Sequence, residues 1–255
     1  MEPVTAVQAD VKPSGPPLLD GMPRQRVRLA PAPAPAPLAL PRPTVAPARR
    51  LPRLWQLLPT PTGTPFTFGY TLVLIATSVF TTYASPALVA TLHQATSTDV
   101  AHLIRTPVFV LLASALWIAG GYTSLYVIGF VLALTALERR IGGARTVVVF
   151  LLGHVLATLA TEGTVGIAVL VGHLPESSLH RMDYGISFGV AACVGALCGL
   201  LRPWLALPIL GYYTWVLVEA LIAFSDPMTN WGHLIALTIG VATWPWVRRW
   251  SAARR

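Results

Sequence analysis

The chain has 255 residues, of which 54% are apolar and only 11% are charged, whereas soluble domains carry about 25% charged residues. This balance excludes a soluble domain with a normally charged surface and favours a polytopic membrane protein. Two cysteines are too few for a disulfide framework. The net charge is +8, but the basic residues flank apolar runs and do not form the basic, aromatic-rich stripe of a nucleic-acid-binding protein.

Residues 1–60 differ from the rest of the chain because they hold most of the prolines, including an alternating Ala-Pro run at 30–37. Proline fixes φ and lacks a donor, so this run favours an extended polyproline II conformation. We expect a disordered, Pro/Ala/Arg-rich cytoplasmic tail. Its basic end, residues 49–53 with Trp55, is also suited to contact anionic lipids.

Apolar runs recur from residue 61 to residue 250, and a membrane-spanning helix needs about 20 residues. The sequence predicts an all-α membrane domain over 61–250 and a basic cytoplasmic end at 251–255. Residues 87–120 start polar and contain a short apolar part, which suggests a re-entrant or interfacial segment. The six expected spans are 66–84, 121–137, 146–161, 186–201, 204–224 and 231–247.

Basic residues determine the expected orientation, because cytoplasmic loops are enriched in Lys and Arg. With the N-terminus inside, only Arg105 and Arg181 of the basic residues lie outside. An odd number of spans would place the basic C-terminus outside. We therefore expect a multi-pass protein of the plasma membrane with both termini in the cytoplasm.

A stripe of small residues begins at Ser187 in the fourth span. Ala191, Gly195 and Gly199 follow at intervals of four residues, a spacing that lets another helix approach almost to backbone contact. On one interpretation Ser187 is simply the first member of this helix-packing stripe.

The sixth span carries a matching stripe at Gly232, Ala236 and Gly240, beside His233. Both spans run in the same direction, so His233 is expected at about the depth of Ser187. A serine and a neutral histidine in contact can act as nucleophile and general base. A lone histidine in a span is more often a hydrogen-bonded structural residue. His233 is therefore a candidate both for a general base and for a structural role.

Other polar residues lie in the spans, where they are costly and therefore candidates for function. His154 and Glu162 share roughly one helix face, as a proton relay would require, but we expect a structural hydrogen bond instead. Glu219 has no assigned role. No histidine spacing matches a zinc signature, and we expect neither a metal nor a cofactor.

Several motifs together resemble the rhomboid family of intramembrane serine proteases. The segment 138–142, Glu-Arg-Arg-Ile-Gly, is similar to the family's Glu-x-Arg-x-Gly segment after its second helix. The segment 185–188, Gly-Ile-Ser-Phe, is similar to the Gly-x-Ser-x nucleophile motif. His233 with Ala236 and Gly240 is similar to the His-x-x-Gly-x-x-x-Gly pattern of the sixth helix. The stretch 113–117 falls where the family has its partly embedded first loop.

The chain also departs from the family pattern. Tyr122 and Tyr126 occupy the place of a His-x-x-x-Asn pair that stabilises the oxyanion, Phe188 follows the serine where glycine is common, and Ala191 replaces a common aromatic residue. A tyrosine hydroxyl can donate in place of the amide, whereas losing a donor costs about 2.7–4 kcal/mol in soluble proteases. The chain resembles a divergent bacterial branch, expected to be actinobacterial from the Ala, Pro and Arg excess typical of GC-rich genomes.

The resemblance implies two functions. In the first, Ser187 attacks a single-span membrane protein near the outer leaflet, His233 is the base, and main-chain amides near Ser187 and Gly185, with Tyr122 or Tyr126, bind the oxyanion. In the second, the chain is inactive and binds transmembrane segments or organises membrane lipids. A transporter is disfavoured because no internal repeat or pair of broken helices occurs.

Overall fold

The computed structural model describes residues 57–119 and 125–254, so the expected tail lies almost entirely outside the described residues. The described part is helical and contains no strand. Among the described residues, three helices are long and apolar enough to cross a membrane: α1 (Pro65–Tyr83), α6 (Gly143–Leu170) and α8 (Pro203–Ile222). At a rise of 1.5 Å per residue, α6 is about 42 Å long and exceeds the hydrocarbon core.

The remaining helices are shorter than the three candidate spans. Between α1 and α5 the chain forms separate short helices, as expected for a segment that does not cross the membrane. These are α2 (Pro86–Ala95), α3 (Val100–Arg105), α4 (Pro107–Ala113) and the 3-10 turn η2 (Ser114–Leu116). The others are α5 (Leu125–Ile141), the 3-10 turn η4 (Glu176–His180), α7 (Ser187–Cys198), α9 (Pro227–Ala242) and α10 (Trp244–Ala252).

Three expected helix ends are wrong. The third span is expected to end at 161, with fraying toward Val171, but α6 continues as a regular helix to Leu170. The second span was expected to stop at 137, but α5 continues through the charged residues to Ile141 and stops at Gly142, whose φ of +91° favours glycine. The sixth span was expected to reach 247, but α9 ends at Ala242 and α10 begins at Trp244. Pro245 lies in the first turn of α10, where a missing N–H costs nothing. The expected boundary at residue 250 falls within α10.

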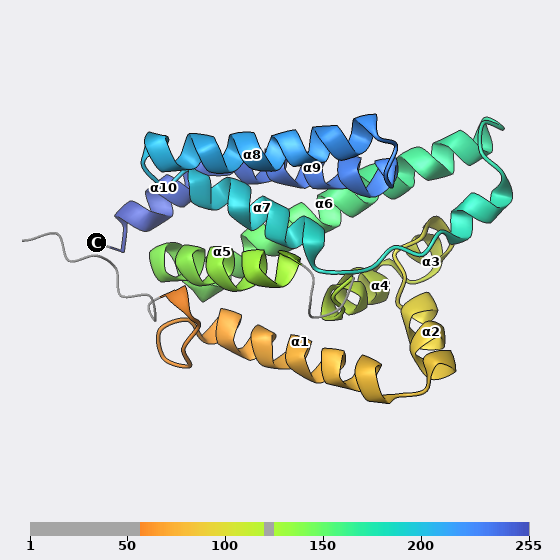
Figure 1. Cartoon of the computed structure of the whole chain (residues 1–255), viewed down its shortest axis with the longest axis horizontal. Helices are drawn as coiled ribbons and strands as arrows, with labels where there is room; N and C mark the ends of the chain where they lie inside the picture. Colours follow the sequence, from red (N-terminus) through yellow and green to blue (C-terminus); the bar gives the residue numbers. More distant parts are fainter. Residues whose placement is uncertain (1–56, 120–124, 255) are drawn as a thin grey trace, which may run out of the picture. The chain divides into compact units, whose positions relative to one another are not determined.

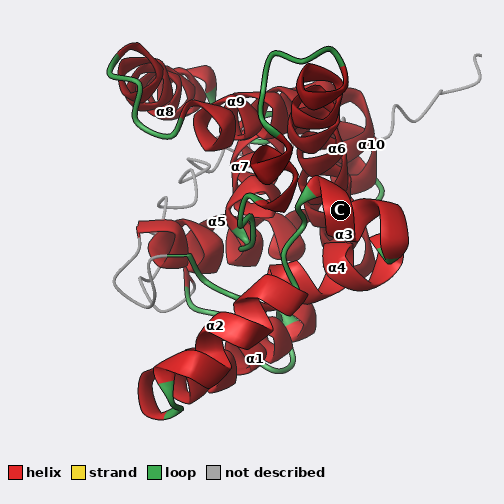
Figure 2. Cartoon of the chain, turned by 90° about the vertical axis from the view of Figure 1, so that its right-hand side faces the viewer, coloured by secondary structure: helices red, strands yellow, loops and turns green. Residues whose placement is uncertain are grey.

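Helix α7 lies at the centre of the helical bundle, with α9 and α8 on one side and α5 on the other (Figure 1). The view along the bundle also shows α7 enclosed by α5, α6 and α9 (Figure 2). Nine of its twelve residues are buried. At about 18 Å, α7 is much shorter than a bilayer core.

Aromatic rings hold α1, α5 and α6 together. Tyr70 of α1 meets Phe130 of α5 and Phe150 of α6 edge-on, at centroid distances of 5.1 and 5.4 Å. Such T-shaped pairs place the positive ring edge on the negative ring face. The Tyr70 hydroxyl donates to the carbonyl oxygen of Ala115 at 2.5 Å, which also fixes the short helical segment before α5.

The buried carboxylate of Glu138 caps the start of α1. It accepts hydrogen bonds from the Phe66 N–H at 2.9 Å, the Thr67 N–H at 2.7 Å and the Thr67 hydroxyl at 2.6 Å. The first N–H groups of a helix lack partners within the helix and carry its positive dipole end, so a carboxylate suits them. Arg254 donates to the main-chain oxygen of Glu138 at 3.3 Å. We call this end of the bundle the Glu138 end.

Candidate functional site

The chain enters α7 through a sharp backbone turn at Gly185. Gly185 has a φ of +125°, which side chains rarely adopt, and its N–H donates to the main-chain oxygen of Ser114 at 3.0 Å. Two residues later, Ser187 is the first residue of α7 and is half-buried. The glycine of the Gly-x-Ser motif therefore ties the approach to α7 against η2.

Three main-chain N–H groups at the start of α7 are available as donors. Those of Ser187, Phe188 and Gly189 make no hydrogen bond to the described residues, and the first helical bond runs from Val190 to Ile186 at 3.0 Å. No side chain in the described part of the chain caps this helix. Such donors, aided by the helix dipole, favour an anion or a developing oxyanion beside Ser187.

His233 lies in the second turn of α9 and is 3% exposed. The ring of Phe188 meets the His233 ring edge-on, with centroids 5.2 Å apart and planes at 81°. The same phenyl ring occupies the space over Gly232, where an added Cβ would lie 2.2 Å from it. The bulky residue after Ser187 thus packs against the start of α9 beside His233.

Glycines bring α7 and α9 into backbone contact along the rest of their length. A Cβ at Gly195 would lie 2.4 Å from the carbonyl oxygen of Leu237, and one at Gly240 would lie 2.1 Å from that of Ala192. Only a missing side chain allows two helices to approach so closely. We call this contact the α7–α9 seam.

The other members of the two stripes also lie in or beside the seam. Ala191 and Ala236 are fully buried and belong to one apolar cluster. Gly199 faces the ring of Trp244, whose Nε1 donates to the main-chain oxygen of Gly195 at 2.9 Å. Of the six small residues singled out for helix packing, four meet in the seam: Ala191, Gly195, Ala236 and Gly240. The other two, Gly232 and Gly199, lie against the rings of Phe188 and Trp244 at its ends.

The two helices run in parallel, and their register places Ser187 and His233 at the same level. Phe188 meets residues 232 and 233 at one end of the seam, and Gly199 meets residue 244 at the other. Among the described residues, the hydrogen bonds do not include one between Ser187 Oγ and a His233 ring nitrogen. Catalytic pairs are often farther apart without a bound substrate than with one.

The side chains of the two tyrosines expected to bind the oxyanion lie outside the described residues. Tyr122 lies outside the described residues, and Tyr126 belongs to α5 but its side chain is likewise outside them. Glu219, whose role was open, lies on an exposed face of α8.

A second serine–histidine pair, Ser114 and His154, escaped the sequence analysis because the two residues are 40 positions apart. Ser114 Oγ lies 3.2 Å from Nε2 of His154, and both side chains are buried. The same Nε2 lies 3.0 Å from the carbonyl oxygen of Leu111. A carbonyl only accepts, so Nε2 carries the proton and cannot take one from Ser114. The pair is structural and fixes η2 against α6.

Charged residues gather at the other end of the bundle, around Arg181. Its guanidinium donates to the buried carboxylate of Glu162 at 2.5 Å and lies 3.8 Å from that of Asp226. Nearby, the side-chain and main-chain oxygens of Asp183 accept from the Thr98 hydroxyl at 3.2 and 3.0 Å. Burial raises the pKa of Asp183 above the usual aspartate range, with Arg181 opposing the shift. We call this end the Arg181 end.

The Arg181 contacts connect the approaches to both helices of the seam. Arg181 lies six residues before Ser187, and Asp226 directly precedes α9. Glu162 belongs to α6, so one guanidinium links the starts of α7 and α9 to α6. Within the described ranges, no three His, Cys, Asp or Glu side chains are grouped as a metal site would require.

Comparison with known proteins gives the family. The family model described as rhomboid-like protein matches residues 62–253, which is most of the chain. The chain therefore belongs to the rhomboid-like protein family, in agreement with the motifs at 138–142 and 185–188. No curated protein and no solved structure matches it.

Proposed function

We propose that the chain is a rhomboid-type intramembrane serine protease in which Ser187 is the nucleophile and His233 the general base. The observation that carries the proposal is the seam, whose register aligns Ser187 with His233. Beside Ser187, the N–H groups of Ser187, Phe188 and Gly189 make no hydrogen bond to the described residues. Transfer of the Ser187 proton to His233 would allow attack on a peptide carbonyl, and the amides would bind the oxyanion.

The site's depth supports a substrate that lies within the membrane. His233 is six residues into α9, or about 9 Å from its start, and Ser187 begins a helix too short to span the bilayer. A single-span membrane protein could present an unwound segment there. We infer that the chain crosses the plasma membrane six times, with both termini cytoplasmic and the Arg181 end outside.

Labelling of the purified protein with a fluorophosphonate serine probe tests the proposed chemistry. The parent should be labelled, and Ser187→Ala and His233→Ala should not. Ser114→Ala is the matched control, because it removes the hydroxyl of the other serine–histidine pair and should leave labelling intact. Labelling that survives in Ser187→Ala would contradict the assignment of the nucleophile.

Reporter fusions test the proposed orientation separately. A reporter after Arg255 should behave as cytoplasmic, and one inserted near Glu176 should behave as external. The reverse result at either position would remove the six-span arrangement.

A second candidate function is a non-catalytic protein that binds transmembrane segments or organises lipids. The contact of Phe188 with the His233 ring favours it, because the phenyl ring packs against the very group that must act as base. An unlabelled parent with an intact fold would support this alternative.

A further inference from the structure

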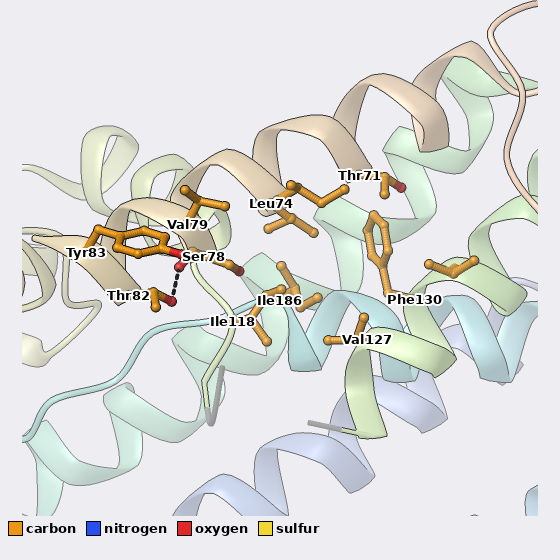
Figure 3. A pocket seen from close by; sticks show the side chains of 12 residues that line it. Thr71, Leu74, Ser78, Val79, Thr82, Tyr83, Ile118, Val127, Phe130 and Ile186 are labelled. Atoms are coloured by element: carbon orange, nitrogen blue, oxygen red, sulfur yellow. Dashed lines mark hydrogen bonds between the residues drawn. The ribbon is translucent and has the colours of Figure 1, made fainter. Parts of the chain in front are cut away.

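An open groove lies between α1 and α5, on the half of α1 that is remote from Glu138 (Figure 3). Its volume is about 360 Å³. Apolar side chains form most of its wall, and the hydroxyl side chains of α1 lie along one edge. The described residues that line it are Thr71, Leu74, Ile75, Ser78, Val79, Thr82, Tyr83, Ile118, Val127, Phe130, Val131 and Ile186.

A smaller and more polar pocket adjoins this groove. It measures about 120 Å³ and shares Ser78 and Ile118 with the groove. Its aromatic wall is held rigidly: the His93 ring stacks on Tyr184 with centroids 4.3 Å apart and meets Trp117 edge-on at 4.8 Å. The Trp117 Nε1 donates to the Thr96 hydroxyl at 2.9 Å. Thr77 and Thr81 complete the wall.

We propose that the groove and the polar pocket together form a binding site for an acylglycerol lipid, with the acyl chain in the groove and the glycerol hydroxyls in the pocket. This inference does not depend on catalysis by Ser187.

The length of the groove fits an acyl chain. From Thr71 to Tyr83 the groove follows about 18 Å of α1, close to the thickness of one leaflet, which is about 15 Å.

The hydroxyl groups of the pocket favour a ligand that donates hydrogen bonds. Thr77 donates its hydroxyl proton to the carbonyl oxygen of Leu74 at 3.1 Å, and Thr81 donates to that of Ser78 at 2.9 Å. Each threonine oxygen keeps lone pairs that can only accept. Ser78 can donate or accept. Hydroxyls of a glycerol group supply the donors that these oxygens lack.

The charges of the site favour a ligand without net charge. None of the described residues that line the two cavities is Asp, Glu, Lys or Arg. His93 is the titratable group among them besides the tyrosines, and burial lowers the pKa of His93 below its ordinary value. A phosphate headgroup would therefore meet no fixed cation, and an ammonium headgroup no anion.

Native mass spectrometry of the full chain, delipidated in detergent and titrated with an 18-carbon monoacylglycerol, tests the proposal. We expect saturable binding of one lipid per protein. Val79→Trp fills the groove and should weaken binding at least tenfold. Val73→Trp is the matched control, because it makes the same change at a second exposed valine of α1 that does not line the groove. Equal affinity of the two variants would overturn the proposal.

The polar pocket is tested by the headgroup. Lysophosphatidylglycerol with the same chain should bind at least tenfold more weakly, and the double variant Ser78→Ala, Thr81→Val should lower monoacylglycerol affinity severalfold. Ser187→Ala should bind like the parent, which separates this site from the proposed protease. Binding of the charged lipid as tightly as the uncharged one would refute the role of the pocket.

Discussion

The α7–α9 seam and the α1–α5 groove both lie between neighbouring apolar helices. In the seam the two backbones touch, whereas the groove leaves open space between its helices. In the seam, Gly195 and Gly240 face main-chain atoms of the opposite helix. In α1, a Cβ added at Gly69 would meet no atom of the described residues within 4 Å. Larger side chains such as Leu74 and Val79 line the groove between α1 and α5 instead.

The comparison teaches that a glycine in a membrane helix packs only when its spacing matches a partner's. Lipid tails are as apolar as leucine, so helices associate through close van der Waals contact and not through burial from water. The seam has two stripes in register, whereas α1 has none facing α5. The space left between α1 and α5 must be filled by something apolar, which in a bilayer is an acyl chain.

The largest effect on stability is expected from a side chain added inside the seam, where there is no space for one. Gly195→Leu should force the backbones apart and destabilise the fold by at least about 3 kcal/mol, since even a Cβ would lie 2.4 Å from the Leu237 oxygen. Gly69→Leu is the control and should be neutral, or stabilising by up to about 1 kcal/mol through helix propensity. Thermal unfolding in detergent measures both. If the two variants melted alike, the seam would not be the tight interface.

Loss of the Glu138 cap should have the second-largest effect on stability. The cap fixes the start of α1, whereas the other half of α1 borders the open groove. Glu138→Gln keeps the size of the side chain but turns one acceptor into an NH₂ group facing the donors of Phe66 and Thr67. We expect a loss of about 2–3 kcal/mol. Arg139→Gln, at the exposed neighbour, should change stability by less than about 0.5 kcal/mol. A neutral result for Glu138→Gln in the same melting assay would show that the cap contributes little.

Loss of the ion pair at the Arg181 end should lower the free energy of unfolding by a smaller amount. This ion pair holds the segments that lead into α7 and α9. Arg181→Met leaves the carboxylate of Glu162 buried without its cation, at a cost of about 2 kcal/mol after allowance for the partial exposure of Arg181. Adding Glu162→Gln should restore much of this loss, because the orphaned charge is removed. A double-mutant cycle of unfolding free energies gives the coupling, and additive losses would argue against the pair.

The smallest effect on stability is expected in the groove. Val79→Trp adds a ring to open space, so the free energy of unfolding should change by less than about 0.5 kcal/mol even as acylglycerol binding is lost. The melting temperature of the lipid-free variant checks this. A large destabilisation would mean that the α1–α5 contact is as closely packed as the seam and that the comparison fails.

Much of the fold and part of the site could be predicted from the sequence. Apolar runs located α1 and α8 to within two residues at each end, because span length follows from bilayer thickness. The four-residue spacing singled out the glycines that meet in the seam, because periodicity along one helix is a local property of the chain.

Only the tertiary structure decided which partners those residues meet. Glu138 caps a helix that begins more than 70 positions earlier, and Ser114 finds His154 across 40 positions. The carbonyl of Leu111 determines that His154 does not act as a base. The side chains of α1 and α5 together determine that these two helices leave a groove between them. Local patterns determine which face a helix offers, whereas hydrogen-bond partners and cavities depend on atoms that only folding brings together.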